Sequence, residues 1–336
     1  MATTRDAVDD LSPAEIREIL IFGYGLTAET IDIVSGELAT VARVRTQDKD
    51  LAVKALPGTE SDGAVVEWQV HGMQVLQSHE LPVPAITSTR DGDAVHRAHL
   101  NGRDIFSVVT DWVNDPALAD VEVQEPLLYE IGELAARVNI ALTNFAPAPT
   151  HISHEWEFAR AGETLRQFIP RIPDAHIREI AEHMANRHDT AVVPLLSTLP
   201  QSVLHQDLHD SNLLIGTDSH GKQFISGILD FGDMMHGPRI AELVVAAAYA
   251  SRHYPDPLHA ITRVVTGWRN MRDITEQEMD VLWTGIVSRL ALNVSIWSAR
   301  TTGPRGSYAQ ARLQGTMPTL EKLLEVDQSE VRQILA

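Results

Sequence analysis

The chain changes character near Asn114, and this change constrains the fold more than any other feature. Before it, apolar and polar residues alternate over Val41–Arg45 and Leu51–Leu56, with the period of two that is typical of strands. After it, apolar residues recur at helical spacing over most of the chain. The sequence therefore predicts an α+β protein with a β-rich N-terminal lobe, residues 1–112, and a larger helical C-terminal lobe, residues 113–336.

The elements of both lobes can be placed from these patterns. The predicted strands of the first lobe are Ile31–Val34, Val41–Arg45, Leu51–Leu56, Ala94–Leu100 and Ile105–Val113, with short helices at Ser12–Leu20 and Ala64–Ser78. The predicted helices of the second lobe are Gln124–Leu142, Glu163–Phe168, Asp174–Val193, Pro238–Arg252, Leu258–Trp268, Thr275–Ser298 and Tyr308–Leu324. The segments that interrupt them, predicted to be a loop flanked by short strands, are Val203–Leu214 and Phe224–Phe231.

Composition narrows the class of partner. The net charge of −19 argues against nucleic acid and anionic membrane, since both favour a basic surface, so we expect neither as a partner. There is no cysteine, which excludes disulfides and thiolate chemistry and fits the cytoplasm. The first residues lack the basic and apolar regions of a signal peptide. The sequence does not predict an oligomeric state.

Two short motifs carry the chemistry. Asp207 is followed five residues later by Asn212, and Asp230 opens an Asp-Phe-Gly-Asp sequence. Phosphoryl transfer needs an acceptor for the proton of the incoming hydroxyl and a divalent metal that neutralises phosphate charge. Asp207 fits the first role, while Asn212 and Asp230 offer the oxygen ligands that Mg²⁺ prefers. Apolar runs at Leu213–Ile215 and Ile225–Leu229 predict two buried strands that hold these motifs.

These motifs carry a resemblance to a known family. The stretch from His205 to Asn212 resembles the catalytic loop of the aminoglycoside phosphotransferase and choline kinase superfamily, written His-Gly-Asp-x-x-x-x-Asn. The run Ile225–Met234 is similar to the hydroxylysine kinase branch, where a nearly identical run carries the metal aspartate. Other segments in the family's order are Tyr24-Gly25-Leu26, Leu81–Pro84, Trp156 and Arg289-Leu290-Ala291. The resemblance implies a protein-kinase-like two-lobed fold with a nucleotide between the lobes.

The resemblance also implies two charged residues at the nucleotide phosphates. Lys54 matches the strand lysine that contacts the α- and β-phosphates, and Glu67 matches the helix glutamate that pairs with this lysine. From the residues alone, a solvated strand lysine and a solvated helix glutamate are the alternatives. The apolar neighbours of Lys54 favour the functional interpretation.

Further nucleotide contacts are implied at two loops. Ser35 and Gly36 match the loop that covers the nucleotide, which here has a single glycine. Thr110, Asp111 and Trp112 match the hinge between the lobes, where backbone groups bind adenine or guanine.

Three residues are candidates for contact with the acceptor. His209 and Asp233 follow the two aspartates of the motifs closely, and each either touches substrate or braces its loop. Trp156 lies between two glutamates in a segment that the family uses near its substrate cleft. One departure from the family pattern lies beside the base, because Gln206 stands where glycine is usual before Asp207.

Together these roles imply a Mg²⁺-dependent kinase that moves the γ-phosphate of ATP or GTP to a hydroxyl of a small, amine-bearing metabolite. A hydroxylysine-like amino alcohol is the favoured acceptor, and an aminoglycoside or homoserine-type acceptor is the alternative. From other classes, the alternatives are a nucleotide-binding regulator that has lost catalysis and an accessory partner of a pyridoxal enzyme.

Overall fold

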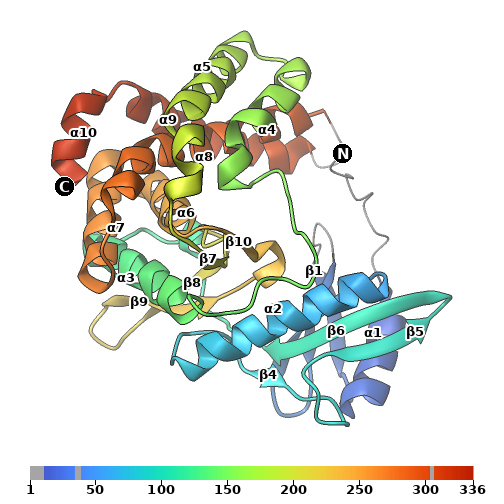
Figure 1. Cartoon of the computed structure of the whole chain (residues 1–336). Helices are drawn as coiled ribbons and strands as arrows, with labels where there is room; N and C mark the ends of the chain where they lie inside the picture. Colours follow the sequence, from blue (N-terminus) through green and yellow to red (C-terminus); the bar gives the residue numbers. More distant parts are fainter. Residues whose placement is uncertain (1–10, 35–38, 303–305, 336) are drawn as a thin grey trace. The chain divides into compact units, whose positions relative to one another are not determined.

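The computed structural model describes residues 11–34, 39–302 and 306–335, and the chain forms two compact units (Figure 1). Unit 1 consists of Met1–Asp115 with two short later segments, Ala148–Ile152 and Gly227–Gly232. Unit 2 consists of Pro116–Pro147, Ser153–Ser226 and Asp233–Ala336. The main break falls close to the predicted boundary at residues 112 and 113, and the Asp-Phe-Gly sequence belongs to unit 1.

Unit 1 is built on an antiparallel sheet with the strand order β1-β2-β3-β6-β4, in which β5 also pairs with β6. The strands are β1 (Thr30–Val34), β2 (Thr40–Arg45), β3 (Asp50–Pro57), β4 (Ile86–Thr87), β5 (His96–Leu100) and β6 (Arg103–Asp111). All were predicted except β4, because a strand of two residues is too short to show alternation.

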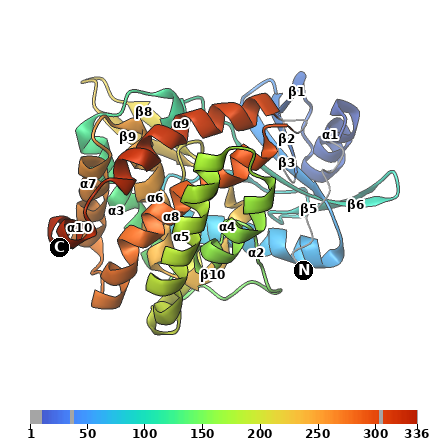
Figure 2. The same cartoon turned by 90° about the horizontal axis from the view of Figure 1, so that it is seen from above.

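Helical elements cover both faces of this sheet (Figure 2). They are α1 (Pro13–Ile19), the π-helical turn η1 (Leu20–Tyr24) and α2 (Glu60–Ser78). On β6, Ile105 and Val109 pack with α1 and η1, whereas Phe106 and Val108 pack with α2. The neighbours of Lys54 on β3 belong to the first cluster. Because side chains alternate along a strand, Lys54 projects from the face that α2 covers.

Unit 2 is mainly helical. Its α-helices are α3 (Glu125–Ala141), α4 (Ala161–Phe168), α5 (Ala175–Ala191), α6 (Ile240–Ala250), α7 (Pro257–Met271), α8 (Glu276–Arg300), α9 (Gly306–Leu324) and α10 (Gln328–Leu335). The 3₁₀ turns of unit 2 are η2 (Leu118–Asp120), η3 (Phe158–Arg160), η4 (Ile169–Arg171), η5 (Val193–Thr198) and η7 (Ser251–His253), and a further turn, η6 (Phe231–Asp233), begins in unit 1 and ends in unit 2. All predicted helices are present, and α10 was not predicted. The predicted α+β class is confirmed.

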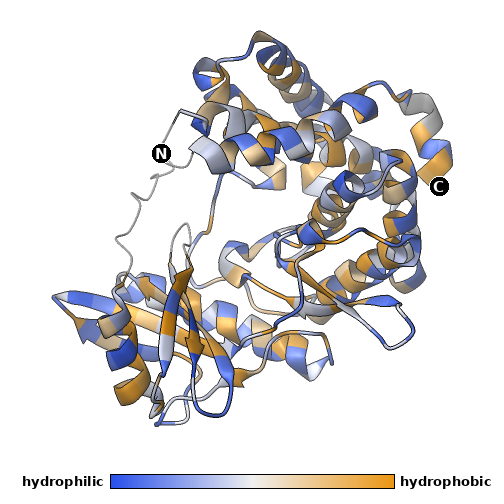
Figure 3. Cartoon of the chain, turned by 180° about the vertical axis from the view of Figure 1, so that it is seen from behind, coloured by the Kyte–Doolittle hydropathy of each residue, from blue (hydrophilic) through white to orange (hydrophobic). Residues whose placement is uncertain are grey.

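The centre of unit 2 is formed by α6 and α8. Every residue of α6 is buried, and most of α8 is buried too. By length and composition α8 would pass for a membrane-spanning helix, but 89% of its apolar window is buried inside the protein. That burial is typical of a core helix. The surface helices instead alternate between hydrophobic and hydrophilic residues (Figure 3).

Two short hairpin-like pairs hold the motif loops. The strands β7 (Gln201–Leu204) and β10 (Met235–Pro238) pair antiparallel, and β8 (Leu213–Thr217) pairs with β9 (Gln223–Ile228). The loop with Asp207 and Asn212 therefore runs from the end of β7 to the start of β8. Asp230 lies two residues after the end of β9. The predicted loop flanked by short strands is confirmed.

In unit 2, α3 and α7 approach each other so closely that only glycine fits at two positions. A Cβ atom added to Gly132 would lie 1.9 Å from the carbonyl oxygen of Val264. A Cβ added to Gly267 would lie 2.0 Å from the carbonyl oxygen of Tyr129. The two glycines thus allow the backbones of the helices to touch.

We expect Gly132→Ala to lower the free energy of unfolding by about 3 kcal/mol, because the clash is with rigid backbone and the helices must separate. In an unpacked helix the same change would stabilise by about 1 kcal/mol. The sign of the effect therefore reports the close approach. Urea unfolding followed by circular dichroism measures it. Ile140→Ala, at a 41% exposed position of α3, is the control and should cost less than about 1 kcal/mol. Unchanged stability of Gly132→Ala would contradict the packing described.

Candidate active site

A buried carboxylate holds the backbone of the loop that carries Asp207. Glu242 on α6 accepts hydrogen bonds from the backbone N–H groups of His205, at 2.7 Å, and Gln206, at 3.0 Å. Gln206 has a φ of 68°, in the left-handed region. Burial raises the pKa of Glu242 to about 7, with Asp207 adding repulsion, although the two N–H groups partly oppose the shift. The loop conformation is therefore fixed from inside the core.

The Asp207 carboxylate is held from two sides. The side-chain amide of Asn212 donates to Asp207 Oδ2 at 2.8 Å and to the Asp207 carbonyl at 3.0 Å. From α8, Arg289 Nη2 donates to Asp207 Oδ1 at 3.3 Å. Because the amide nitrogen of Asn212 faces Asp207, its Oδ1 is the atom that can bind a metal ion. The structure thus brings together the predicted base and one predicted metal ligand.

His209 braces this carboxylate. Its Nε2 lies 3.4 Å from Asp207 Oδ2, and its Nδ1 lies 3.3 Å from Asp210 Oδ1 and 2.9 Å from the backbone nitrogen of Ser211. The ring also packs against the ring of Tyr249, with centroids 5.3 Å apart. Burial lowers the pKa of His209, but the carboxylates of Asp207 and Asp210 outweigh it and raise the pKa above its usual value. These contacts match the bracing role, while contact with an acceptor stays a prediction.

Asp210 is a buried anchor that the sequence reasoning missed. Its Oδ2 accepts from Arg252 Nη1 at 2.7 Å and from His253 Nε2 at 2.6 Å, and Arg312 Nη1 lies 3.3 Å from Oδ1. Burial alone would raise the pKa of Asp210, but hydrogen bonds from His209 and His253 with the charge of Arg252 hold it well below its usual range. In the sequence, Asp210 was indistinguishable from an ordinary loop aspartate.

In unit 1, Lys54 and Asp230 form an ion pair. Lys54 Nζ lies 2.6 Å from Asp230 Oδ1, which also accepts from the N–H of Gly232 at 3.1 Å. From α2, Gln69 donates to the carbonyl of Gly232 at 2.9 Å. The structure therefore joins the predicted phosphate-binding lysine to the predicted metal-binding aspartate, and α2 anchors the turn that follows.

Glu67 pairs with Arg97 in this structure, and its pairing with Lys54 stays a prediction. Glu67 Oε1 lies 2.7 Å from Arg97 Nη2, and Arg97 also binds Glu60. Arg97 stands on β5 and stacks over the ring of Phe106, 5.6 Å from its centroid, where its planar guanidinium spans both acids of α2. A two-pronged arginine is the better partner for two carboxylates than a single lysine ammonium.

The predicted hinge residues are largely engaged by the sheet. Thr110 on β6 lies opposite Ala52 of β3 and Ile86 of β4. The N–H of Asp111 donates to the carbonyl of Ala85, and the N–H of Trp112 donates to the carbonyl of Asp50. Among the described residues, the next backbone N–H, that of Val113, has no acceptor. Thr110, Asp111 and Trp112 as nucleotide contacts stay predictions, but Val113 is the better candidate donor. Ser35 and Gly36, the other predicted contacts, lie outside the described residues.

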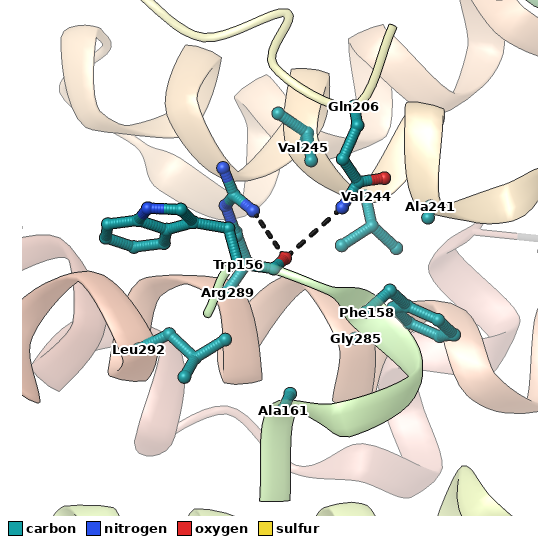
Figure 4. Close-up of a pocket in the computed structure, with 10 residues that line it drawn as sticks. All are labelled: Trp156, Phe158, Ala161, Gln206, Ala241, Val244, Val245, Gly285, Arg289 and Leu292. Carbon is teal, nitrogen blue, oxygen red and sulfur yellow. Dashed lines mark hydrogen bonds between the residues drawn. The ribbon is translucent and has the colours of Figure 1, made fainter. Parts of the chain in front are cut away.

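Trp156 is tied to the catalytic loop by its backbone. Its carbonyl oxygen accepts from Arg289 Nη1 at 2.8 Å and from the side-chain amide of Gln206 at 3.2 Å (Figure 4). The cavity beside these bonds is about 10 Å³, room for about one water and too small for an acceptor.

Asp233 lies near His154. Burial lowers the pKa of His154, and the negative charge of Asp233 opposes this shift in part. Contact of Trp156 and Asp233 with an acceptor stays a prediction.

Comparison with known proteins places these motifs in a family context. A sequence model of the phosphotransferase enzyme family matches residues 30–274. A hydroxylysine kinase of Danio rerio is 24% identical over 340 residues, covering 98% of this chain and 96% of the relative. A microcompartment-associated aminopropanol kinase matches in structure with a TM-score of 0.65 and 15% identity, over 97% of this chain and 100% of that one. An amicoumacin kinase in complex with AMP-PNP and Ca²⁺ matches with a TM-score of 0.67 and 10% identity, over 96% and 97%. The predicted protein-kinase-like fold and the family resemblance are confirmed.

The raised pKa of Glu242 predicts a pH-dependent stability. Its folded pKa of about 7 lies above the ordinary value of 4.5, so the folded state binds the proton more tightly. This contribution is present below pH 4.5 and is lost as pH rises through 7, by up to about 3 kcal/mol. In Glu242→Gln that titration is removed, and the amide leaves one loop N–H unpaired, at a cost of about 1–3 kcal/mol.

We therefore expect the stability advantage of the wild type over Glu242→Gln to shrink between pH 5 and pH 8. Urea unfolding at both pH values measures it. A difference that is the same at both values would contradict the shifted pKa.

Proposed function

Because the chain belongs to the phosphotransferase enzyme family, we propose that it is a Mg²⁺-dependent kinase that moves the γ-phosphate of ATP or GTP to a hydroxyl of a small, amine-bearing metabolite. The observation that carries the proposal is the Asp207 carboxylate held between the Asn212 amide and the Arg289 guanidinium. A hydroxylysine-like amino alcohol is the favoured acceptor, since a relative of nearly equal length is a hydroxylysine kinase.

In this proposal Asp207 receives the acceptor hydroxyl. A loose transition state for phosphoryl transfer needs orientation of the hydroxyl more than it needs a strong base. An aspartate fixed on both oxygens suits that task, because its carboxylate cannot rotate away from the hydroxyl. Asp207 therefore acts mainly by aiming the nucleophile.

The metal ligands proposed are Asn212 and Asp230. Both offer hard oxygen atoms, and Mg²⁺ takes its other ligands from phosphate and water. Asn212 fits because its amide nitrogen is committed to Asp207, which leaves the oxygen for metal. When bound, the metal would neutralise charge that develops on the phosphates.

Lys54 is proposed to bind the nucleotide phosphates. In the structure it pairs with Asp230, and the two side chains are 42% and 53% exposed. An exposed ion pair contributes little free energy, so both partners can exchange it for phosphate and metal at small cost. The nucleotide base is assigned to the hinge, with the N–H of Val113 as its donor. Glu67 is proposed to position Lys54 when nucleotide is bound, by exchanging its partner Arg97 for the lysine.

The remaining parts of the proposal concern the acceptor and the cell. His209, Asp233 and Trp156 are assigned to the acceptor side, with His209 acting through Asp207. An aminoglycoside or homoserine-type acceptor is the alternative within the family. A regulator without catalysis is disfavoured, because Asp207, Asn212 and Asp230 are all present. A chain without cysteine suits a reducing compartment, so the cytoplasm is the proposed location.

We expect Asp207→Asn to lower turnover about 1000-fold or more while nucleotide still binds, since the amide cannot accept the hydroxyl's proton. The measurement is Mg²⁺-dependent nucleoside diphosphate release with a panel of amino alcohols, aminoglycosides and homoserine. Asp189→Asn is the control, because Asp189 pairs with Arg166 on the surface of unit 2 and should leave turnover unchanged. Full activity in Asp207→Asn would overturn the proposed mechanism.

The proposed metal role predicts a different result for Asp230→Asn. Loss of one ligand charge should raise the Mg²⁺ concentration for half-maximal turnover about tenfold or more. Turnover measured against Mg²⁺ concentration at saturating acceptor tests this. An unchanged Mg²⁺ dependence would rule out Asp230 as a ligand.

A further inference from the structure

Arg289 is a buried charge whose contacts converge on the catalytic loop. Its side chain is 4% exposed and lies in the core helix α8. Nη2 donates to Asp207, Nη1 donates to the carbonyl of Trp156, and Nε has no acceptor among the described residues. A buried guanidinium with an unmet donor costs stability relative to an apolar residue. Folding alone therefore does not account for an arginine here.

Two aromatic rings pack against this guanidinium. Arg289 lies over the ring of Trp156, 5.0 Å from its centroid, and over that of Tyr249, 5.5 Å from its centroid. Cation–π contacts hold the orientation of the fork as well as its position. Since the guanidinium is held in place, Nη2 and Nη1 set the distance between the Asp207 carboxylate and the Trp156 carbonyl.

Gln206 supplies a second tie to the same carbonyl oxygen. Its side-chain amide donates to Trp156 at 3.2 Å, and Figure 4 shows both donors meeting at this atom. Gln206 is 1% exposed and immediately precedes Asp207. Glycine, which is usual at this position in the resembled family, has no side chain to make this bond. The non-glycine residue therefore joins the segment at Trp156 to the catalytic loop.

We propose that Arg289, with Gln206, is a positioning device that holds Asp207 and the acceptor-side segment Ser153–Glu157 in one fixed relation. The inference rests on the proposed role of Asp207 as the group that receives the hydroxyl. Because Arg289 binds both and Gln206 joins them, Asp207 and the segment Ser153–Glu157 keep a fixed position relative to each other. Arg289 itself touches no reacting atom.

This inference predicts that loss of Arg289 changes the kinetic constants of the acceptor and of the nucleotide differently. Arg289 contacts Asp207, Trp156 and Tyr249, which all belong to unit 2. Lys54 and Val113, proposed for the nucleotide, belong to unit 1. Loss of Arg289 should therefore disturb kcat and the acceptor KM and spare the nucleotide KM. A residue needed only for folding would disturb all three together, in step with the melting temperature.

The test compares full-length Arg289→Met, Arg289→Lys and Arg300→Met. We expect Arg289→Met to lower kcat about 100-fold, the loss that a small misplacement of a catalytic group causes, and to raise the acceptor KM with the nucleotide KM unchanged. Arg289→Lys should recover part of kcat, since the ammonium can reach one of the two acceptors. If Arg289→Met does not fold, the same split is read from Arg289→Lys against the wild type.

Arg300→Met is the matched control. Arg300 stands on the same helix, lies 5.4 Å from the ring centroid of Trp297, and pairs with Glu155, the neighbour of Trp156. Among the described residues, Arg300 contacts Glu155 and the rings of Phe168 and Trp297 but neither Asp207 nor the Trp156 carbonyl, so kcat should stay near the wild-type value. A nucleotide KM that rises in parallel with the acceptor KM in Arg289→Met, or an unchanged kcat, would overturn the inference.

A double-mutant cycle tests the shared carbonyl. Gln206→Met removes the amide but keeps a side chain of similar length at the same left-handed backbone position. Because both donors act through one oxygen, the effects of Gln206→Met and Arg289→Met on the acceptor KM should combine to less than their product. Independent, multiplicative effects would show that the two residues act separately and would sink the shared tie.

Asp207→Asn, assayed alongside, separates the two levels of failure. If Asp207→Asn keeps its turnover, the proposed role of Asp207, on which this inference rests, fails. If Asp207→Asn is inactive and Arg289→Met behaves as wild type, only the positioning inference fails. If the enzyme phosphorylates no acceptor of the panel, its hydrolysis of the nucleoside triphosphate by water is measured instead. Arg289→Met should then lower kcat and leave the nucleotide KM unchanged.

Discussion

The two hydrogen bonds from the catalytic loop to the Glu242 carboxylate are the contacts on which the candidate site depends. Between β7 and β8 the loop leaves the sheet pattern, so its buried N–H groups at His205 and Gln206 need another acceptor. Glu242 meets both from within α6, at the cost of a carboxylate with a pKa of about 7. That cost is tolerated because the direction of the loop backbone decides where the Asp207 carboxylate points.

Each unit holds one of the two motif aspartates, Asp230 or Asp207, beside a cation, and these two pairs differ in a way that suits their proposed tasks. The Lys54–Asp230 pair is about half exposed, so solvent screens it and it exchanges partners readily. The Arg289–Asp207 pair is largely enclosed, with the two side chains 4% and 14% exposed, and the arginine packs against the ring of Trp156. Partners of phosphate and metal must change during a reaction cycle, whereas the group that aims the hydroxyl must not move. The burial of each pair matches that division.

Sequence patterns were sufficient for what is local and insufficient for what depends on which elements lie side by side. Alternation predicted the strands around Lys54, and motif spacing predicted that Asp207 and Asn212 would act together. The ion pair of Glu67 with Arg97 was not predicted, because Arg97 reaches Glu67 from β5 and no spacing in the sequence encodes that neighbour. Arg289 lies 82 residues from Asp207 along the chain, so its contact became visible only in the structure.

Both motifs contain a non-glycine residue in the left-handed region, Gln206 with a φ of 68° and Asp230 with a φ of 56°. Such a conformation costs about 1–2 kcal/mol and persists only where surrounding contacts over-determine it. At Gln206 those contacts are the Glu242 carboxylate on the backbone and the Trp156 carbonyl on the side chain. At Asp230 they are Lys54 and the nearby Gly232 N–H. Glycine would relieve the strain at Gln206 but would also remove one of the two donors to the Trp156 carbonyl, so the strained residue helps Arg289 to hold the loop and the acceptor-side segment together.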